Sequence, residues 1–344
     1  MSRRFRINTS MADFNINHIT GKQGQQGTVL AGITTVNSTG AMRIPSGPIE
    51  NRGGRGRGVF GGGETPSRIN NLDLITIATT GNASDFGDLV ETATNIGACG
   101  SSTRGIWFGG ETPSVSDTIQ YIIFSSQGGS NDFGSLSFAR LNHNSGLSDN
   151  TRGITGGAYA SPSYYNLIEY VTIASTGNTS DFGDLSANKY GLAGLSSPTR
   201  GIFAGGDPGS SPYANNVIEY ITIQSKGNSQ DFGDMTVAKM NSGGAASSTR
   251  GLMMGGKNPS TQDTIDYITI ATLGNAADFG DTTGSASKVA AVSNSVRAVM
   301  GGGGATDMSY VTIASTGNAT DYGDLTTARA TLGACSDSHG GIGD

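Results

Sequence analysis

Six copies of a short acidic motif are the residues whose types and spacing most readily suggest chemistry in this sequence. The motif is Asp-Phe-Gly-Asp or a close variant, and its copies begin at Asp85, Asp132, Asp181, Asp231, Asp278 and Asp321. The aspartate of an Asp-Phe-Gly triplet holds Mg²⁺ in one class of phosphoryl-transfer site. In the third copy, Asn178, Asp181 and Asp184 also bring three oxygen donors together, as a Ca²⁺ site requires. The motif therefore raises two hypotheses, phosphoryl transfer and calcium binding.

The spacing of the copies favours a structural role instead. Successive copies lie 47, 49, 50, 47 and 43 residues apart, without a glycine-rich phosphate loop, a strand lysine or a His-Arg-Asp motif. A phosphoryl-transfer site needs those companions, and the oxygen donors lack the spacing of a helix-loop-helix calcium loop. We expect the first aspartate to accept backbone N–H bonds and the glycine to bend the chain after the aromatic residue packs. Calcium binding remains the alternative, and no metal ion or cofactor is expected.

A second repeated side chain is an arginine, which occurs once in every repeat. The series is Arg57, Arg104, Arg152, Arg200, Arg250 and Arg297. One possible role is to line a channel and bind anions. The preferred role is structural: the planar fork of donors pairs with a repeat aspartate or with backbone carbonyls and fixes the strand register. A basic residue also opens most of the segments that follow the acidic motif, namely Arg140, Lys189, Lys239, Lys288 and Arg329, with Thr94 at that place in the second repeat.

Catalytic residues are not suggested by any other pattern. The histidines His18, His143 and His339 fall at unrelated places, and no repeat position assembles a Ser-His-Asp or Cys-His set. Cys99 and Cys335 occupy equivalent repeat positions, which predicts two small core residues with free thiols. We therefore expect a protein that is not an enzyme and has no catalytic residue.

Strands must position all of these side chains, because a repeat of 40–50 residues that encodes strands is the signature of a β-propeller. Each repeat contains four strand-like segments, which in the fourth repeat are Tyr190–Ser196, Thr199–Gly206, Val217–Ile223 and Gln230–Met235. The third segment alternates apolar and polar residues, as a half-buried strand does. A Thr-Gly-Asn turn then supplies residues that tolerate positive φ, as a hairpin to the fourth segment needs.

The order of the segments predicts how the ring closes. The first repeat begins with a second segment at Arg57, and residues 328–336, which follow the sixth acidic motif, match a first segment. In particular, Gly333-Ala334-Cys335 copies Gly97-Ala98-Cys99. We predict an all-β fold over residues 57–344: a six-bladed β-propeller of four-stranded blades, closed by a C-terminal strand that completes the first blade.

The N-terminal region differs from the repeats in sequence and charge. Residues 1–50 do not repeat and are predicted to form an extended anchoring arm, followed by a Gly/Arg linker at 51–56. Residues 1–56 carry a net charge of +5 and the remainder −11. The acidic body argues against duplex nucleic acid as a ligand. No apolar run reaches the roughly 18 residues that would insert into a membrane, and the basic start lacks the apolar stretch of a secretory signal.

The repeats resemble kelch repeats over about residues 57–340. Glycine pairs such as Gly62-Gly63 and Gly205-Gly206 end the second segment, and a tyrosine follows in the third. The repeat tyrosines are Tyr121, Tyr170, Tyr220, Tyr267 and Tyr310. A kelch repeat also places a tryptophan soon after the tyrosine, whereas Trp107 lies elsewhere here. The resemblance implies a kelch-like propeller and no particular function.

A narrower resemblance covers the arm and the repeats together. A leader such as Gly27–Pro48 before repeats such as IEYVTIASTGNTSDFGD looks like structural proteins of tailed phages, particularly marine and cyanobacterial ones. It implies a virion component of the tail-fibre, tail or capsid-surface type, present in multiple copies. Residues 1–50 would dock onto other virion proteins, and the propeller would contact host-surface glycan or a neighbouring protein. The alternatives are a decoration protein without receptor binding and a glycan-active propeller enzyme.

The loops between the second and third segments are the expected place for a ligand, because they vary most between repeats. In the third and fourth repeats these loops contain Tyr159, Tyr164, Tyr165 and Tyr213. Exposed tyrosines beside Asn and Asp suit stacking on sugars or contact with a protein surface. Partial burial of the rings inside the loops is the competing interpretation.

Overall fold

The computed structural model describes residues 35–36, 42–43 and 56–342, and the chain divides into two units, Met1–Gly47 and Pro48–Asp344. In the first unit, β1 (Thr35–Val36) pairs antiparallel with β2 (Met42–Arg43). The other residues of the predicted arm at 1–50, and linker residues 51–55, lie outside the described residues.

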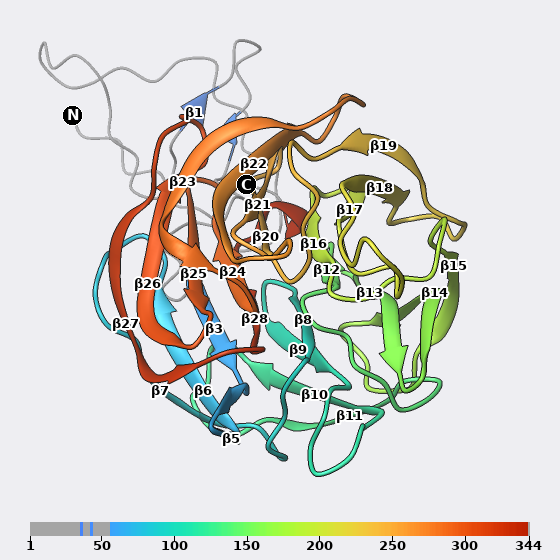
Figure 1. Cartoon of the computed structure of the whole chain (residues 1–344). Helices are drawn as coiled ribbons and strands as arrows, with labels where there is room; N and C mark the ends of the chain where they lie inside the picture. Colours follow the sequence, from blue (N-terminus) through green and yellow to red (C-terminus); the bar gives the residue numbers. More distant parts are fainter. Residues whose placement is uncertain (1–34, 37–41, 44–55, 343–344) are drawn as a thin grey trace, which may run out of the picture. The chain divides into compact units, whose positions relative to one another are not determined.

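The second unit contains six four-stranded antiparallel sheets that surround a common centre as blades (Figure 1). From the innermost strand outward, blade 1 consists of β28 (Gly333–Ser336), β3 (Arg57–Gly61), β6 (Asn71–Thr76) and β7 (Ser84–Asp88), and blade 2 consists of β8 (Gly97–Gly100), β9 (Arg104–Phe108), β10 (Thr118–Ile123) and β11 (Asn131–Ser135). In the same order, blade 3 consists of β12 (Gly146–Ser148), β13 (Arg152–Ala160), β14 (Ser163–Thr172) and β15 (Ser180–Asp184), and blade 4 consists of β16 (Ala193–Ser196), β17 (Arg200–Ala204), β18 (Val217–Thr222) and β19 (Gln230–Asp234). Blade 5 consists of β20 (Gly243–Ala246), β21 (Arg250–Met254), β22 (Gln262–Thr269) and β23 (Ala277–Ala286), and blade 6 consists of β24 (Val289–Ser293), β25 (Arg297–Gly302), β26 (Ala305–Thr312) and β27 (Thr320–Arg329). The predicted all-β, six-bladed propeller is confirmed. A small hairpin, β4 (Glu64–Thr65) and β5 (Ser67–Arg68), follows β3, and a 3-10 helix, η2 (Gly340–Ile342), follows β28.

The ring closes through the last strand of the chain, as predicted. β28 pairs antiparallel with β3, with Ala334 opposite Phe60 and Cys335 opposite Val59. The indole Nε1 of Trp107 in blade 2 donates to the carbonyl of Gly333 at 3.2 Å. The innermost strand of blade 1 therefore follows all the other strands in sequence, pairs with β3 of its own blade and accepts a hydrogen bond from the Trp107 side chain of blade 2.

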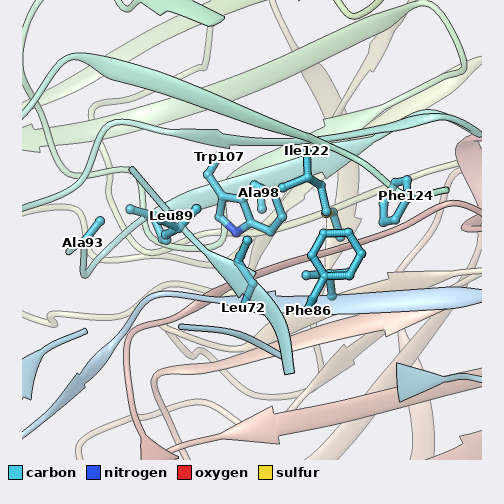
Figure 2. Packing of buried hydrophobic residues seen from close by; sticks show 11 residues of the cluster. Leu72, Phe86, Leu89, Ala93, Ala98, Trp107, Ile122 and Phe124 are labelled. Carbon is cyan, nitrogen blue, oxygen red and sulfur yellow. The ribbon is translucent and has the colours of Figure 1, made fainter. Parts of the chain in front are cut away.

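The hydrophobic core consists of six clusters, one between each pair of neighbouring blades. Figure 2 shows the cluster of blades 1 and 2, in which Leu72 and Phe86 lie against Trp107 and Ile122. Phe86 is the aromatic residue of the first acidic motif, and the other five aromatic residues of the series are buried in the same way: Phe133, Phe182, Phe232, Phe279 and Tyr322. Several thin interfaces explain how a chain with 35% hydrophobic residues forms a stable fold.

The turn before each acidic motif docks on the motif of the preceding blade. In blade 4, Gly227 N donates to Phe182 O of blade 3 at 2.8 Å, and Ser229 N donates to Asp184 O at 2.8 Å. The Asn228 side chain accepts a hydrogen bond from Asp184 N at 3.0 Å. Of the two turn residues that tolerate positive φ, only the glycine uses it (Gly227, φ +155°). The asparagine is needed for its side-chain oxygen.

One prediction concerns the glycine of the acidic motif, which lies directly under the docked turn. Gly183 has φ +150°, and a Cβ there would lie 2.4 Å from Gly227 O. Gly183→Ala should therefore lower the free energy of unfolding by about 2–4 kcal/mol, from backbone strain and separation of two blades.

Gly177→Ala is the matched control for this substitution. Gly177 has φ +157°, and a Cβ there would meet no atom within 4 Å. Backbone strain should be the only cost of this substitution. Its loss in the free energy of unfolding, measured by chemical denaturation, should therefore be about 1–2 kcal/mol smaller than that of Gly183→Ala. Equal losses for the two variants would show that the close approach of the turn contributes nothing.

In four of the blades, a buried ion pair connects a basic residue that precedes the inner strand to the third strand of the blade. The pairs are Arg140–Glu169 in blade 3, Lys189–Glu219 in blade 4, Lys239–Asp266 in blade 5 at 2.8 Å and Arg329–Asp73 in blade 1 at 3.0 Å. In blades 2 and 6 the same two positions hold Ala93 with Gln120 and Ala286 with Ser309. A cation is present only where an anion faces it, which satisfies the requirement that a buried charge be paired.

The expected placement of Lys288 and Thr94 in this series was wrong. Gly256 N donates to the carbonyl of Ala286, as Gly206 N does to that of Lys239, so Ala286 occupies the basic position. Lys288 lies two residues later at φ +60°, half exposed and 3.8 Å from Glu64. Ala93, not Thr94, holds the equivalent position in blade 2, because its carbonyl accepts from Gly63 N.

The ion pair of blade 4 predicts acid sensitivity. Burial alone raises the pKa of Glu219, but Lys189 and the hydrogen bonds from Ser186 outweigh it and hold the pKa below its usual value. A carboxyl whose pKa is depressed in the folded state stabilises the fold at pH values above its pKa in the unfolded state, which is near 4.3. This contribution is lost as the pH falls through the folded-state pKa.

The free energy of unfolding should consequently fall between about pH 5 and pH 2. The Lys189→Ala/Glu219→Gln variant lacks this titrating group and should show a shallower fall in urea denaturation over the same range. Identical slopes for variant and wild type would exclude Glu219 as a source of the acid sensitivity.

Candidate functional site

The repeat arginines connect neighbouring blades. The Arg200 guanidinium lies 4.6 Å from the ring centroid of Tyr220 and donates to Ile270 O of blade 5 at 2.6 Å. The guanidinium groups of Arg57, Arg104, Arg152 and Arg250 likewise donate to the carbonyls of Phe124, Ile173, Ile223 and Ile313. Arg297 stacks on Tyr310 at 4.5 Å. The residues that line the central cavity include none of these arginines, so the contacts are those of a scaffold.

The repeat aspartates Asp85, Asp132, Asp181, Asp231, Asp278 and Asp321 are all exposed. Asp85 accepts a hydrogen bond from Gly87 N at 3.1 Å, which is the backbone contact expected of the motif. Asn178, one of the three oxygen donors in the calcium hypothesis, accepts from Ser135 N of blade 2 at 3.0 Å. Among the described residues, no group of three or more His, Cys, Asp or Glu side chains is arranged to hold a metal ion.

The centre of the ring holds a cavity of about 60 Å³, lined by the inner strands of the blades and by His339. At the start of the inner strands, the Asn144 amide donates across the ring to Ser242 O at 3.3 Å and to Val289 O. At their other end, His339 Nε2 lies 2.8 Å from Gly100 O and 3.2 Å from Ser148 Oγ. The cavity has room for a few water molecules, at roughly 10–15 Å³ each. It is too small for a sugar ring.

The remaining candidates for chemistry are buried. His143 is enclosed, and burial together with the charge of Lys288 lowers its pKa to about 3, so its imidazole is neutral at physiological pH. Cys99 and Cys335 are free, buried thiols in two interblade clusters, as expected from the sequence. Burial raises the pKa of Cys99 to about 12, which keeps the thiol protonated and unreactive.

We call Tyr159, Tyr164, Tyr190 and Tyr213 together with Asp207 the tyrosine patch. Tyr159 and Tyr164 belong to the β13–β14 hairpin, Tyr213 and Asp207 belong to the loop between β17 and β18, and Tyr190 precedes β16. Tyr159 and Tyr164 face each other across the β13–β14 hairpin, with ring centroids 4.9 Å apart. Tyr190 lies 6.1 Å from Tyr159. The Tyr213 side chain, on the same loop as Asp207, is 61% exposed. The patch thus has three half-buried rings and one exposed ring.

Tyr165 does not belong to the patch, although the sequence placed it there. Its ring packs on Phe138 with a centroid distance of 4.8 Å, and the Arg140 guanidinium lies 5.0 Å from the Phe138 centroid. β14 begins at Ser163, so Tyr164 and Tyr165 are consecutive strand residues and point to opposite faces. Tyr190, which was not predicted from the sequence, lies against Tyr159 and belongs to the patch instead.

Hydrogen bonds fix the tyrosines of the patch. Tyr164 Oη donates to Asp207 Oδ2 at 3.1 Å, and Gly209 N donates to Asp207 Oδ1 at 2.8 Å. Tyr190 Oη donates to Asn95 Oδ1 of blade 2 at 2.8 Å. Burial and the Asp207 charge raise the pKa of Tyr164 to about 12, and burial also raises the pKa of Tyr190. Both phenols are therefore neutral at neutral pH, and because each donates its single O–H within the protein, its oxygen can only accept a hydrogen bond from a ligand.

Comparison with known proteins adds no identity to this site. No protein-family model matches the chain, and no curated protein is significantly similar to it. Within the part of the chain that the structure describes, no helix is long and apolar enough to cross a membrane.

Proposed function

We propose that this chain is a non-enzymatic structural protein of a tailed-phage particle whose kelch-like propeller binds host-surface glycan through the tyrosine patch. The tyrosine patch is the observation that carries the proposal. The repeated arginines, aromatic residues and turns are engaged in contacts between blades, whereas the patch occurs once. It carries an exposed aromatic ring on the same loop as a carboxylate that is hydrogen-bonded to a phenol. Such side chains stack on sugars and bond their hydroxyls.

The placement in a virion rests on the resemblance of the leader and repeats to phage structural proteins. In this proposal residues 1–50 attach the protein to other virion proteins in multiple copies, and the acidic propeller is displayed. Deleting residues 1–50 should yield a folded propeller that is absent from purified particles. Incorporation at the wild-type level would show that the arm is not the anchor.

The glycan-binding proposal predicts the effect of removing the exposed ring. Tyr213→Ala in the full-length protein should weaken binding to host cells about tenfold, the loss typical of an exposed aromatic contact residue. Its melting temperature should stay unchanged because Tyr213 is 61% exposed. Binding is measured by flow cytometry of cells incubated with labelled protein.

Leu273→Ala is the matched control, because Leu273 is 57% exposed but lies in the turn before β23. It should bind as the wild type does. Equal binding by wild type and Tyr213→Ala would reject the patch as the contact surface. Release of reducing sugar from the bound glycan would reject the non-enzymatic proposal, and binding to phage capsid but not to cells would favour a decoration protein.

A further inference from the structure

The two loops that form the tyrosine patch have an unusual charge composition. Residues 157–167 and 205–216 contain one ionisable acid, Asp207, and neither loop contains a lysine or an arginine. The basic residues nearest to these loops in sequence, Arg152 and Arg200, donate to the carbonyls of Ile223 and Ile270. Lys189, next to Tyr190, is buried in its ion pair with Glu219. The patch therefore has no mobile cation of its own.

Asp207 is a carboxylate held in place without a countercharge. Its two oxygens accept from Gly209 N and Tyr164 Oη, which fixes their position and leaves lone pairs on each oxygen. The structure shows no ion pair between Asp207 and any described lysine or arginine. The nearby acids Glu111 and Glu64 are by contrast partnered, by Arg68 at 2.6 Å and by Lys288 at 3.8 Å.

The surroundings add to the negative potential at this place. Tyr190 pairs with Asp207 in an isolated β-bridge, which brings the unpaired carboxylate next to the aromatic residues of the patch. The faces of the tyrosine rings carry the negative end of the ring quadrupole and attract cations. A fixed carboxylate beside aromatic faces selects a ligand with both a positive charge and an apolar C–H surface.

We infer that the tyrosine patch recognises a saccharide that carries a protonated primary amine. In this arrangement the sugar ring stacks on Tyr213, and the ammonium group bonds Asp207. The inference deepens the proposed glycan binding and rests on it. It assigns the selectivity to Asp207, which supplies charge, and the general affinity to Tyr213, which supplies contact area.

Three tetrasaccharides with the same β-1,4 backbone test the inference: one of glucosamine, one of N-acetylglucosamine and one of glucose. Isothermal titration calorimetry with the full-length protein at pH 6 should give an affinity for the glucosamine tetramer at least about tenfold above the other two. Raising the salt concentration should reduce that difference, because the contact is ionic and partly exposed.

Two variants separate charge from contact area. Asp207→Asn keeps an oxygen for Gly209 N and should abolish the preference among the three sugars. Tyr213→Ala should weaken all three by a similar factor. A preference that survives in Asp207→Asn, or equal affinity of the wild type for all three sugars, would overturn the inference and leave the proposed glycan binding intact. Binding of none of the three would overturn the inference, and the host-cell assay alone would then decide the proposed function.

Discussion

Deleting residues 333–344 is expected to abolish cooperative folding of the propeller. The deletion removes β28, so β3 keeps only its pairing with β6 and becomes an open edge at the centre of the ring. Val59 and Trp107, which are both buried beside β28, become exposed. Domains of this kind are stable by only about 5–15 kcal/mol, and the loss of a complete inner strand is of that order. Thermal unfolding followed by circular dichroism should show a broad transition or none.

A shorter deletion of residues 338–344 is the control for this experiment. It leaves β28 in place and keeps the Asp337 carboxylate, which accepts hydrogen bonds from Gly56 N at 2.7 Å and Arg57 N at 2.9 Å. It removes η2 and His339, and the expected loss is about 1–3 kcal/mol with a sharp transition. If the longer deletion melted as sharply and as high as the wild type, closure by the last strand would be refuted.

Breaking a buried ion pair is expected to have the second largest effect. Lys189→Ala leaves the Glu219 carboxylate buried and without its cation, since Glu219 is 1% exposed. Removing one partner of such a pair typically costs about 3–5 kcal/mol. Urea denaturation of the variant at pH 7 measures this loss.

Blade 2 shows how a blade can lack the ion pair without burying an unpaired carboxylate. There the two positions hold Ala93 and Gln120, and the Gln120 side-chain oxygen accepts from Val90 N at 2.7 Å and Ser130 Oγ at 2.9 Å. Glu219 makes the corresponding contacts with Ser186 N at 2.8 Å and Ser229 Oγ at 3.0 Å. Lys189→Ala/Glu219→Gln should therefore recover most of the loss, to within about 1–2 kcal/mol of wild type. A double variant no more stable than Lys189→Ala would contradict this explanation of the series.

The architecture was predictable because it depends on repetition. Matching Gly333-Ala334-Cys335 to Gly97-Ala98-Cys99 was sufficient to predict which strand closes the ring, since β28 and β8 occupy the same position in their blades. The contacts between the turn at Gly227 and the strand of blade 3 could not be predicted. They join residues about 45 positions apart, and the local pattern shows only that a turn is present.

Register and strand length account for the errors at the candidate site. The residues around Tyr164 resemble a loop in sequence, but β13 extends to Ala160 and β14 already begins at Ser163. The alternation of side chains along β14 therefore puts Tyr164 and Tyr165 on opposite faces. Tyr190 follows Lys189 at the start of the inner segment, outside the variable loops. Only the pairing of Tyr190 with Asp207 brings it to the patch.

The central claim is that the tyrosine patch, which occurs once, binds the ligand, whereas the repeated acidic motif is scaffold. Hydrogen-exchange mass spectrometry of the full-length protein, with and without a bound saccharide, tests this claim most directly. Protection confined to residues 157–167 and 205–216 is the expected result. Protection centred on the acidic motifs, such as residues 181–184, or no difference at a saturating sugar concentration, would contradict the claim.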